Sequence, residues 1–154
     1  MDSTDESNFT PLHHAAFHTQ LECVKLLADK GGNVNAQASR AITPLMLCVG
    51  APDVLSNRLS LTRAQESPSV LAIRCLVEKG ASLDAAQTKD GRTALHEAVY
   101  CKSLTALKAL LDLQADANLS DLQGNTPLHL ALDFDEAISL LVDNCDMNLT
   151  NNEG

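Results

Sequence analysis

A four-residue motif, Thr-Pro-Leu-His, returns at intervals along this chain of 154 residues. It is complete at Thr10 and Thr126, reads Thr-Pro-Leu-Met from Thr43, and reads Thr-Ala-Leu-His from Thr93. The four copies are spaced 33, 50 and 33 residues apart. A unit of this size cannot bury its apolar face alone, so the period predicts a stack of similar units that share one continuous core.

Each copy of the motif predicts the start of a short helix. Threonine can cap a helix through its hydroxyl, and proline suits the first helical position because its missing N–H is not needed there. Small and aliphatic residues follow at helical spacing, as at Leu12, Ala15 and Ala16. A second apolar stretch then ends at a glycine, Gly31 in the first unit and Gly80 in the second, which favours a left-handed helix end. The units are therefore predicted to be helix pairs.

Turn-forming residues close each unit and predict a hairpin-shaped loop before the next motif. Gly91 and Gly124 would supply positive φ near the tips of two of these loops, and the second unit has Ala41 at the corresponding position. The fourth unit is three residues short, so its first helix is expected to turn early into its second at Asp133-Phe134-Asp135.

With T-P-L-H-x-A or a variant of it on a basic period of 33 residues, the chain resembles the ankyrin-repeat family. The resemblance implies an all-α solenoid of stacked helix-turn-helix units with protruding hairpin loops. We expect a single domain over residues 1–154, with the following approximate boundaries: repeats at 5–37, 38–87, 88–120 and 121–150, and the start of a further repeat at 151–154. The second repeat carries an insertion at about 51–67. A tolerated surface insertion is favoured there over a docking loop or a phosphorylation site at Ser67-Pro68.

Composition favours a folded intracellular protein. The hydrophobic content of 45% is ample for a core, no apolar run approaches the roughly 18 residues that span a bilayer, and Met1–Ser7 lacks a signal-peptide pattern. Four of the five cysteines fall where the repeat expects a buried residue, and we interpret them as reduced core side chains: Cys23, Cys48, Cys75 and Cys145. The expected location is cytoplasmic and/or nuclear, without membrane association.

The net charge of −9 is concentrated at one end of the chain. Residues 109–154 contain nine acidic side chains and no lysine or arginine. A field of one sign attracts a basic partner and repels phosphate, so a basic protein or peptide is expected and nucleic acid is not. The alternative is a solubilising acidic end with no partner of its own.

The resemblance implies that a partner lies along the concave face, in contact with the hairpin tips and the exposed ends of the inner helices. These positions are Phe9, Phe17, His18, Arg40, Ile42, Lys89, Arg92, Tyr100, Leu122, Gln123, Asp133 and Phe134. They include all three phenylalanines and the single tyrosine, and aromatic side chains dominate interface hot spots. The alternative for Phe9 and Phe134 is that they fold back as plugs on terminal or shortened repeats.

Residues with catalytic or ligand chemistry do not form a convincing site in the sequence. His13, His96 and His129 share one position of the motif, which indicates an architectural role. His14 and His18 are four residues apart, but no more than two ligands can be argued there, and a metal site needs three or four. We therefore expect neither enzymatic activity nor a metal or cofactor.

One modification follows from the resemblance. Hairpin asparagines of ankyrin repeats are targets of an asparaginyl hydroxylase that favours leucine eight residues earlier. Asn35, Asn118 and Asn148 have that spacing. The alternative is that asparagine simply stabilises the turn.

The sequence as a whole favours a protein-interaction module, expected to be monomeric on its own, that binds a basic protein or peptide. One alternative is an inhibitor of a transcription factor, similar to the IκB proteins. Another is the substrate-targeting part of a larger enzyme or ligase, which the partial repeat at 151–154 favours.

Overall fold

The computed structural model describes residues 3–51 and 66–152. Within those ranges the regular structure is helical and contains no strand, which confirms the predicted all-α solenoid. In chain order the elements are α1 (Pro11–Phe17), α2 (Leu21–Asp29), a 3-10 turn η1 (Ser39–Ala41), α3 (Pro44–Gly50), α4 (Pro68–Glu78), α5 (Ala94–Tyr100), α6 (Leu104–Asp112), α7 (Pro127–Leu130) and α8 (Asp135–Val142).

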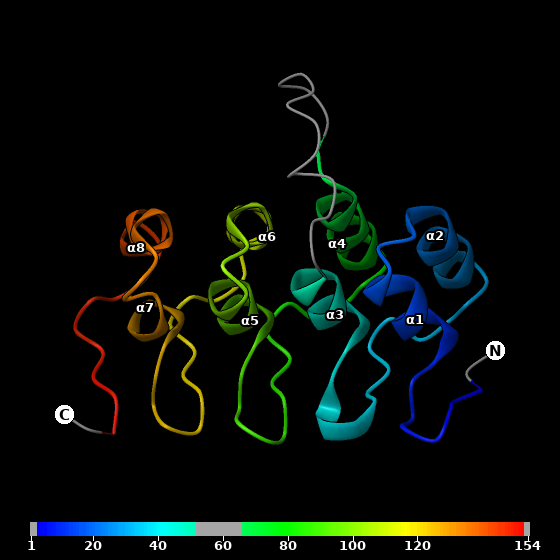
Figure 1. Ribbon diagram of the computed structural model, residues 1–154, viewed down its shortest axis with the longest axis horizontal. Helices are drawn as coiled ribbons and strands as arrows, with labels where there is room; N and C mark the ends of the chain where they lie inside the picture. The colour runs from blue at the N-terminus through cyan, green and yellow to red at the C-terminus, as the bar shows by residue number, and fades with distance from the viewer. Residues whose placement is uncertain (1–2, 52–65, 153–154) are drawn as a thin grey trace.

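The helices form two layers (Figure 1). The inner helices α1, α3, α5 and α7 lie in one row, the outer helices α2, α4, α6 and α8 lie in a second row beside it, and the hairpin loops project from the inner row. Each helix packs on its partner and on the helix of the same layer in the next repeat. We call the surface formed by the hairpin loops and the exposed side of the inner helices the inner face.

The inner helices begin where the motif predicts. Proline occupies the first turn of α1, α3 and α7, and the preceding Thr10, Thr43 and Thr126 have the extended backbone of a helix cap. Ser67 caps α4 in the same way, because its hydroxyl accepts a hydrogen bond from the backbone N–H of Val70 at 3.4 Å.

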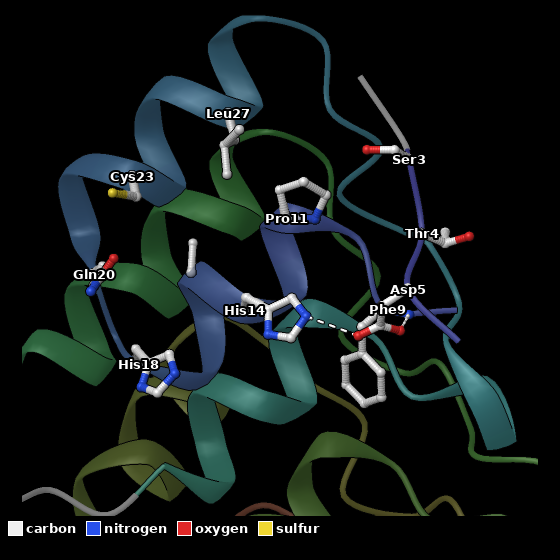
Figure 2. A pocket seen from close by; sticks show the side chains of 11 residues that line it. Ser3, Thr4, Asp5, Phe9, Pro11, His14, His18, Gln20, Cys23 and Leu27 are labelled. Carbon is white, nitrogen blue, oxygen red and sulfur yellow. Dashed lines mark hydrogen bonds and ion pairs between the residues drawn. The ribbon is translucent and has the colours of Figure 1, made fainter. Parts of the chain in front are cut away.

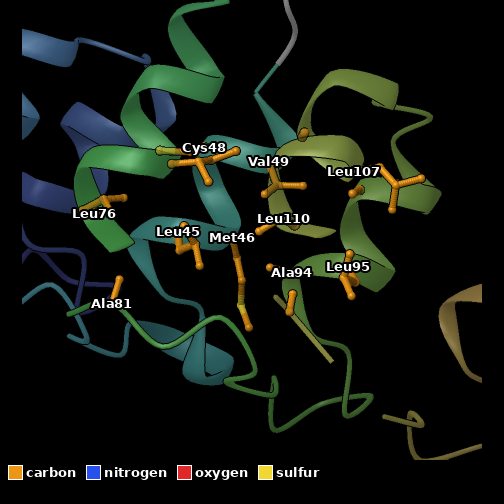
Figure 3. Packing of buried hydrophobic residues seen from close by; sticks show 14 of the residues in the cluster. Leu45, Met46, Cys48, Val49, Leu76, Ala81, Ala94, Leu95, Leu107 and Leu110 are labelled. Carbon is orange, nitrogen blue, oxygen red and sulfur yellow. The ribbon is translucent and has the colours of Figure 1, made fainter. Parts of the chain in front are cut away.

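The core lies between the two layers and runs through all four repeats. Figure 3 shows the part of it formed by the second and third repeats. Its large side chains are mostly leucines on successive helices, such as Leu45, Leu76, Leu95 and Leu107. Fully buried alanines, such as Ala98, stand between them and allow neighbouring helices to approach closely. The interior is therefore continuous packing.

Successive hairpin loops are joined by backbone hydrogen bonds. The N–H of Thr88 donates to Arg40 O at 3.0 Å, and the N–H of Leu122 donates to Asp90 O at 2.9 Å. Asn152 donates to Gln123 O at 3.1 Å in the same manner. These single backbone hydrogen bonds between neighbouring loops link the loops into a ribbon along the inner face.

A left-handed residue two positions before each motif threonine allows the hairpin turn. Asn8, Ala41, Gly91 and Gly124 have φ values of 60°, 57°, 75° and 79°. At Gly91 a Cβ atom would also approach the backbone N of Leu122 to 2.9 Å. The expectation that Ala41 occupies a glycine position is therefore confirmed, and the alanine is strained there.

The shortened fourth repeat has the expected early turn, since α7 has four residues where α1 and α5 have seven. The predicted insertion at about 51–67 lies mostly outside the described residues, at 52–65. The repeat boundaries themselves remain a prediction.

The prediction that Cys23 is a core residue is wrong, because its side chain is exposed. The corresponding residues of the next two outer helices, Ala72 and Ala106, are fully buried, and each of those helices packs on the outer helix before it. In the described chain α2 has no repeat on that side, so Cys23 is uncovered. Cys48 and Cys75 are buried as expected, and burial raises the pKa of the Cys48 thiol to about 12. Cys145 is half-buried.

No helix in the described ranges is both long and apolar enough to cross a membrane.

Candidate functional site: the inner face

The structure places most of the predicted partner-binding residues at the surface. Phe17, Tyr100 and Leu122 are 49%, 68% and 63% exposed. The other exposed members of the set are polar or charged: His18, Arg40, Lys89, Gln123 and Asp133. The four that are half-buried are Phe9, Ile42, Arg92 and Phe134.

Phe17 and Tyr100 occupy the same position in their repeats, the last residue of α1 and of α5. Their rings stand on the two helices with much of their area open to solvent. The ring of His18 lies edge-on to Phe17, with centroids 5.2 Å apart. Two exposed aromatic rings on one face are the kind of anchor that a protein partner buries.

Tyr100 carries a cation on its ring. The guanidinium carbon of Arg92 lies 5.0 Å from the ring centroid, and Arg92 Nε lies 3.9 Å from Asp90 Oδ2. Glu97 is three residues earlier on α5, a spacing that places two side chains on the same side of a helix. The third repeat therefore presents an aromatic ring among side chains of both charges.

Phe9 and Phe134 are held differently from these two. Phe9 packs against two histidine rings of α1, with centroid distances of 5.3 Å to His13 and 5.8 Å to His14. Phe134 precedes α8, donates its N–H to Ala131 O at 2.8 Å and packs against the core. These contacts favour the plug interpretation of Phe134.

Two of the motif histidines, His13 and His96, bridge consecutive repeats. His96 Nδ1 accepts a hydrogen bond from the Thr93 backbone N–H at 3.2 Å, and its Nε2 lies 2.9 Å from Asn125 O. Because a carbonyl can only accept, the Nε2 atom carries a proton. The Nδ1 atom accepts from an N–H and therefore carries none, so the ring is neutral. His13 repeats the arrangement with Thr10 and with Ile42 O, at 3.1 and 3.0 Å.

These histidines have a structural role. Burial lowers the pKa of His13 and of His96, and the accepted bond at Nδ1 leaves no room for a second proton. In the described chain no three His, Cys, Asp or Glu side chains converge as a metal-binding group would require.

The three asparagines of the hydroxylation prediction lie in the loops after the outer helices. Asn35 is bonded at both side-chain atoms: Nδ2 donates to Gly80 O at 2.9 Å, and Oδ1 accepts from Ser82 N–H at 2.7 Å. Asn118 Oδ1 accepts from the N–H of Asp146 at 2.7 Å. These amides join consecutive repeats, which the sequence did not predict.

The sequence also did not predict a groove of about 570 Å³ at the end of the stack near α1 and α2 (Figure 2). One wall is the segment before α1, which Asp5 holds by accepting from the N–H groups of Ser7 and Phe9, both at 2.9 Å. His14 Nε2 closes that wall with a hydrogen bond of 3.1 Å to Asp5 Oδ2. Cys23 lies across the groove on α2.

The sequence does contain a signal for the ordered segment that forms this wall, namely an aspartate at a fixed distance before the motif threonine. Asp121 accepts hydrogen bonds from two loop N–H groups in the fourth repeat, as Asp5 does in the first, and each stands five residues before its motif threonine. An aspartate at that position therefore marks an ordered hairpin.

Comparison with known families agrees with this architecture. A model of ankyrin repeats in three copies matches residues 1–57, a model of many copies matches residues 76–131, and a model of the single repeat matches residues 123–152. The chain therefore belongs to the ankyrin-repeat family. Ankyrin repeats are generally non-catalytic modules that bind other proteins.

Individual relatives are much longer than this chain. It is 25% identical over 186 residues to the E3 ubiquitin-protein ligase KEG of Arabidopsis thaliana, covering 99% of this chain and 11% of the ligase. It is 31% identical over 142 residues to the human neurogenic locus notch homolog protein 1, covering 87% of this chain and 5% of that protein. The zebrafish (Danio rerio) protein of the same name is 37% identical over 103 residues, covering 67% and 4%.

Proposed function

We propose that the inner face of this chain binds a protein or peptide partner that carries basic residues. The family resemblance implies that the inner face is the concave face. The observation that carries the proposal is the pair of exposed rings, Phe17 and Tyr100, at the same position of α1 and α5. An exposed aromatic ring contributes nothing to the core and gains most when a partner covers it.

The charge of the chain supports a basic partner. All nine charged side chains after Lys108 are acidic, and one of them, Asp133, is exposed and belongs to the predicted partner-binding set. Basic segments are drawn to such a field, and phosphate-rich ligands are repelled by it. The partner we propose is therefore a protein, with neither nucleic acid nor a membrane surface as ligand, and the site we propose includes no metal or cofactor.

Affinity enrichment from cell extract tests the proposal with three forms of the protein: wild type, the double variant Phe17→Ala/Tyr100→Ala, and the outer-face control Leu71→Ala. Leu71 is 37% exposed on α4 and lies away from the inner face. We expect the double variant to lose proteins that the other two retain. Equal capture by all three forms would contradict binding at the inner face.

A second candidate is the substrate-targeting part of a larger ligase. The similarity to a stretch of an E3 ubiquitin-protein ligase over 99% of this chain favours it. It differs from the stand-alone module, or an IκB-like inhibitor, only in what else the natural polypeptide contains. Sequencing of the full transcript distinguishes them.

We also propose Asn35, Asn118 and Asn148 as substrates of an asparaginyl hydroxylase. Asn35 is bonded at both amide atoms, whereas the amide of Asn148 bonds only locally, to Asp146 Oδ1 at 3.0 Å, among the described contacts. Modification needs the loop to open, so we expect Asn148 to react before Asn35. Mass spectrometry of peptides after incubation with the hydroxylase and its co-substrates tests this by the gain of one oxygen atom.

A further inference from the structure

Glu97 is a half-buried carboxylate on the inner face of α5. Its Oε1 accepts a hydrogen bond of 2.9 Å from the side-chain amide of Gln87, which comes from the hairpin before the helix. Burial raises the pKa of this carboxyl. A carboxylate that has lost water, and whose side-chain hydrogen bond comes from a neutral amide, is incompletely compensated when burial still raises its pKa.

The cations of the described chain do not neutralise Glu97. It takes part in none of the ion pairs within 4.0 Å among the described residues. Arg92 is the nearby cation whose charge acts on it, but the guanidinium of Arg92 lies on the Tyr100 ring, with its Nε nearest to Asp90. Glu97 thus has capacity for a further positive charge.

The surroundings of Glu97 suit a cation with an apolar stem. Leu47 and Leu130 occupy the same position of α3 and α7, the helices that pack on either side of α5 (Figure 1), and both are half-buried. Tyr100 follows Glu97 by three residues and is 68% exposed, so its ring rises on the same side of α5. We call Glu97, Tyr100, Leu47 and Leu130 the Glu97 site.

We propose that the Glu97 site binds a lysine or arginine side chain of the protein partner. The inference rests on the proposed function and names the contact that would select a basic partner. The methylene stem lies along the leucines and the tyrosine ring, and the charged end reaches the carboxylate. An acidic side chain there would be repelled by Glu97, and an apolar one would bury the carboxylate without a counter-charge.

Selection from a displayed library of random 12-residue peptides tests the proposal, with wild-type protein and the Glu97→Gln variant as parallel baits. Glutamine keeps the size of the side chain and can still bond to Gln87, so the variant is expected to fold; its circular dichroism and melting temperature check this. His14→Gln is the matched control, because His14 occupies the same position on α1.

We expect a lysine or arginine at a fixed place in the peptides selected by wild type and by His14→Gln, and its loss with Glu97→Gln. Affinities by fluorescence polarisation then complete a double-mutant cycle with a selected peptide and its norleucine analogue. We expect each single change to weaken binding about five- to tenfold, and the second change to add little once the first is made.

The outcomes separate this inference from the proposed function. Peptides that lose binding to Phe17→Ala/Tyr100→Ala but show no basic preference, or fully additive losses in the cycle, would overturn the Glu97 site and leave the proposed function standing. Failure of every bait to enrich any peptide would overturn both.

Discussion

The imidazole Nε2–H of His96 donates to the backbone O of Asn125 at 2.9 Å, so a side chain of the third repeat fixes the hairpin of the fourth. The same carbonyl already accepts the N–H of Asp121 at 2.9 Å. His13 and Ile42 O form the equivalent pair between the first two repeats. The motif histidine is therefore a connector between units as well as part of its own helix cap.

The second repeat lacks this connector, because Met46 occupies the histidine position. The carbonyl that a histidine would reach is that of Arg92, the residue before the next motif threonine, and it accepts only from Gln87 N–H at 2.9 Å among the described contacts. We predict that Met46→His raises the free energy of unfolding by about 1 kcal/mol through one new hydrogen bond. Urea denaturation measures it. Met46→Leu is the control, since it keeps an apolar side chain and adds no bond; an equal gain there would remove the explanation.

The two bridging histidines also predict how stability depends on pH. Burial lowers the pKa of both His13 and His96 below the ordinary 6.5, so the unfolded chain binds protons at a higher pH than the folded one. Their contribution to stability is complete above about pH 6.5 and is lost as the pH falls below that value. The urea concentration at the unfolding midpoint should therefore decrease as the pH falls from about 7.5 to about 5, a range that extends roughly one unit or more to each side of the transition.

The comparison for this pH dependence is the double variant His13→Gln/His96→Gln. Glutamine can keep hydrogen bonds but does not titrate in this range, so the slope below pH 6.5 should flatten even if the protein is less stable throughout. An unchanged slope would assign the pH dependence to other groups.

Backbone strain predicts a stabilising change at the end of α6. Gln114 has a φ of 68°, at the position where the first two outer helices have Gly31 and Gly80. We predict that Gln114→Gly raises the free energy of unfolding by about 1 kcal/mol, because glycine adopts this conformation without strain. The matched control is Gly80→Ala. Its Cβ would meet nothing within 4 Å, so a loss of similar size there would come from the backbone alone.

Measurements of peptide affinity and melting temperature should distinguish aromatic residues of the interface from those of the core. Truncation of Phe17 or Tyr100 to alanine is predicted to weaken binding of a selected peptide by more than about 1 kcal/mol each with little change in melting temperature. Phe134→Ala should do the reverse, because Phe134 packs against the core below α8. A large stability loss with Phe17→Ala or Tyr100→Ala would place those rings in the structure instead of the interface.

The helices and the stack were predictable because they follow from local signals repeated four times. A threonine cap, a proline in the first turn and apolar residues at helical spacing are each readable without knowledge of neighbours. Whether Cys23 is buried could not be predicted in this way, because that depends on whether another repeat covers α2. The same limit applies to the candidate site: Tyr100 could be chosen from the sequence, but the cation on its ring and the half-buried state of Glu97 need the packed helices.

Asp84 provides the last prediction, from the row of side chains that joins the loops after the outer helices. Its Oδ1 accepts from the N–H of Asp116 at 3.0 Å, as Asn35 accepts from Ser82 at 2.7 Å. Asn35 also donates through Nδ2 to the Gly80 carbonyl at 2.9 Å, a bond that an aspartate cannot make.

Asp84→Asn should therefore gain a donor toward the corresponding carbonyl of Gln114 and remove one of two neighbouring acidic charges. We predict a rise of about 0.5–1 kcal/mol in the free energy of unfolding, measured in urea at neutral pH. Raising the salt concentration separates the two causes, since a gain from lost repulsion shrinks with salt and a gain from a hydrogen bond persists. Asn35→Asp is the reverse change and should cost a similar amount. Stabilisation by both substitutions would show that the amide donor has no part in joining the repeats.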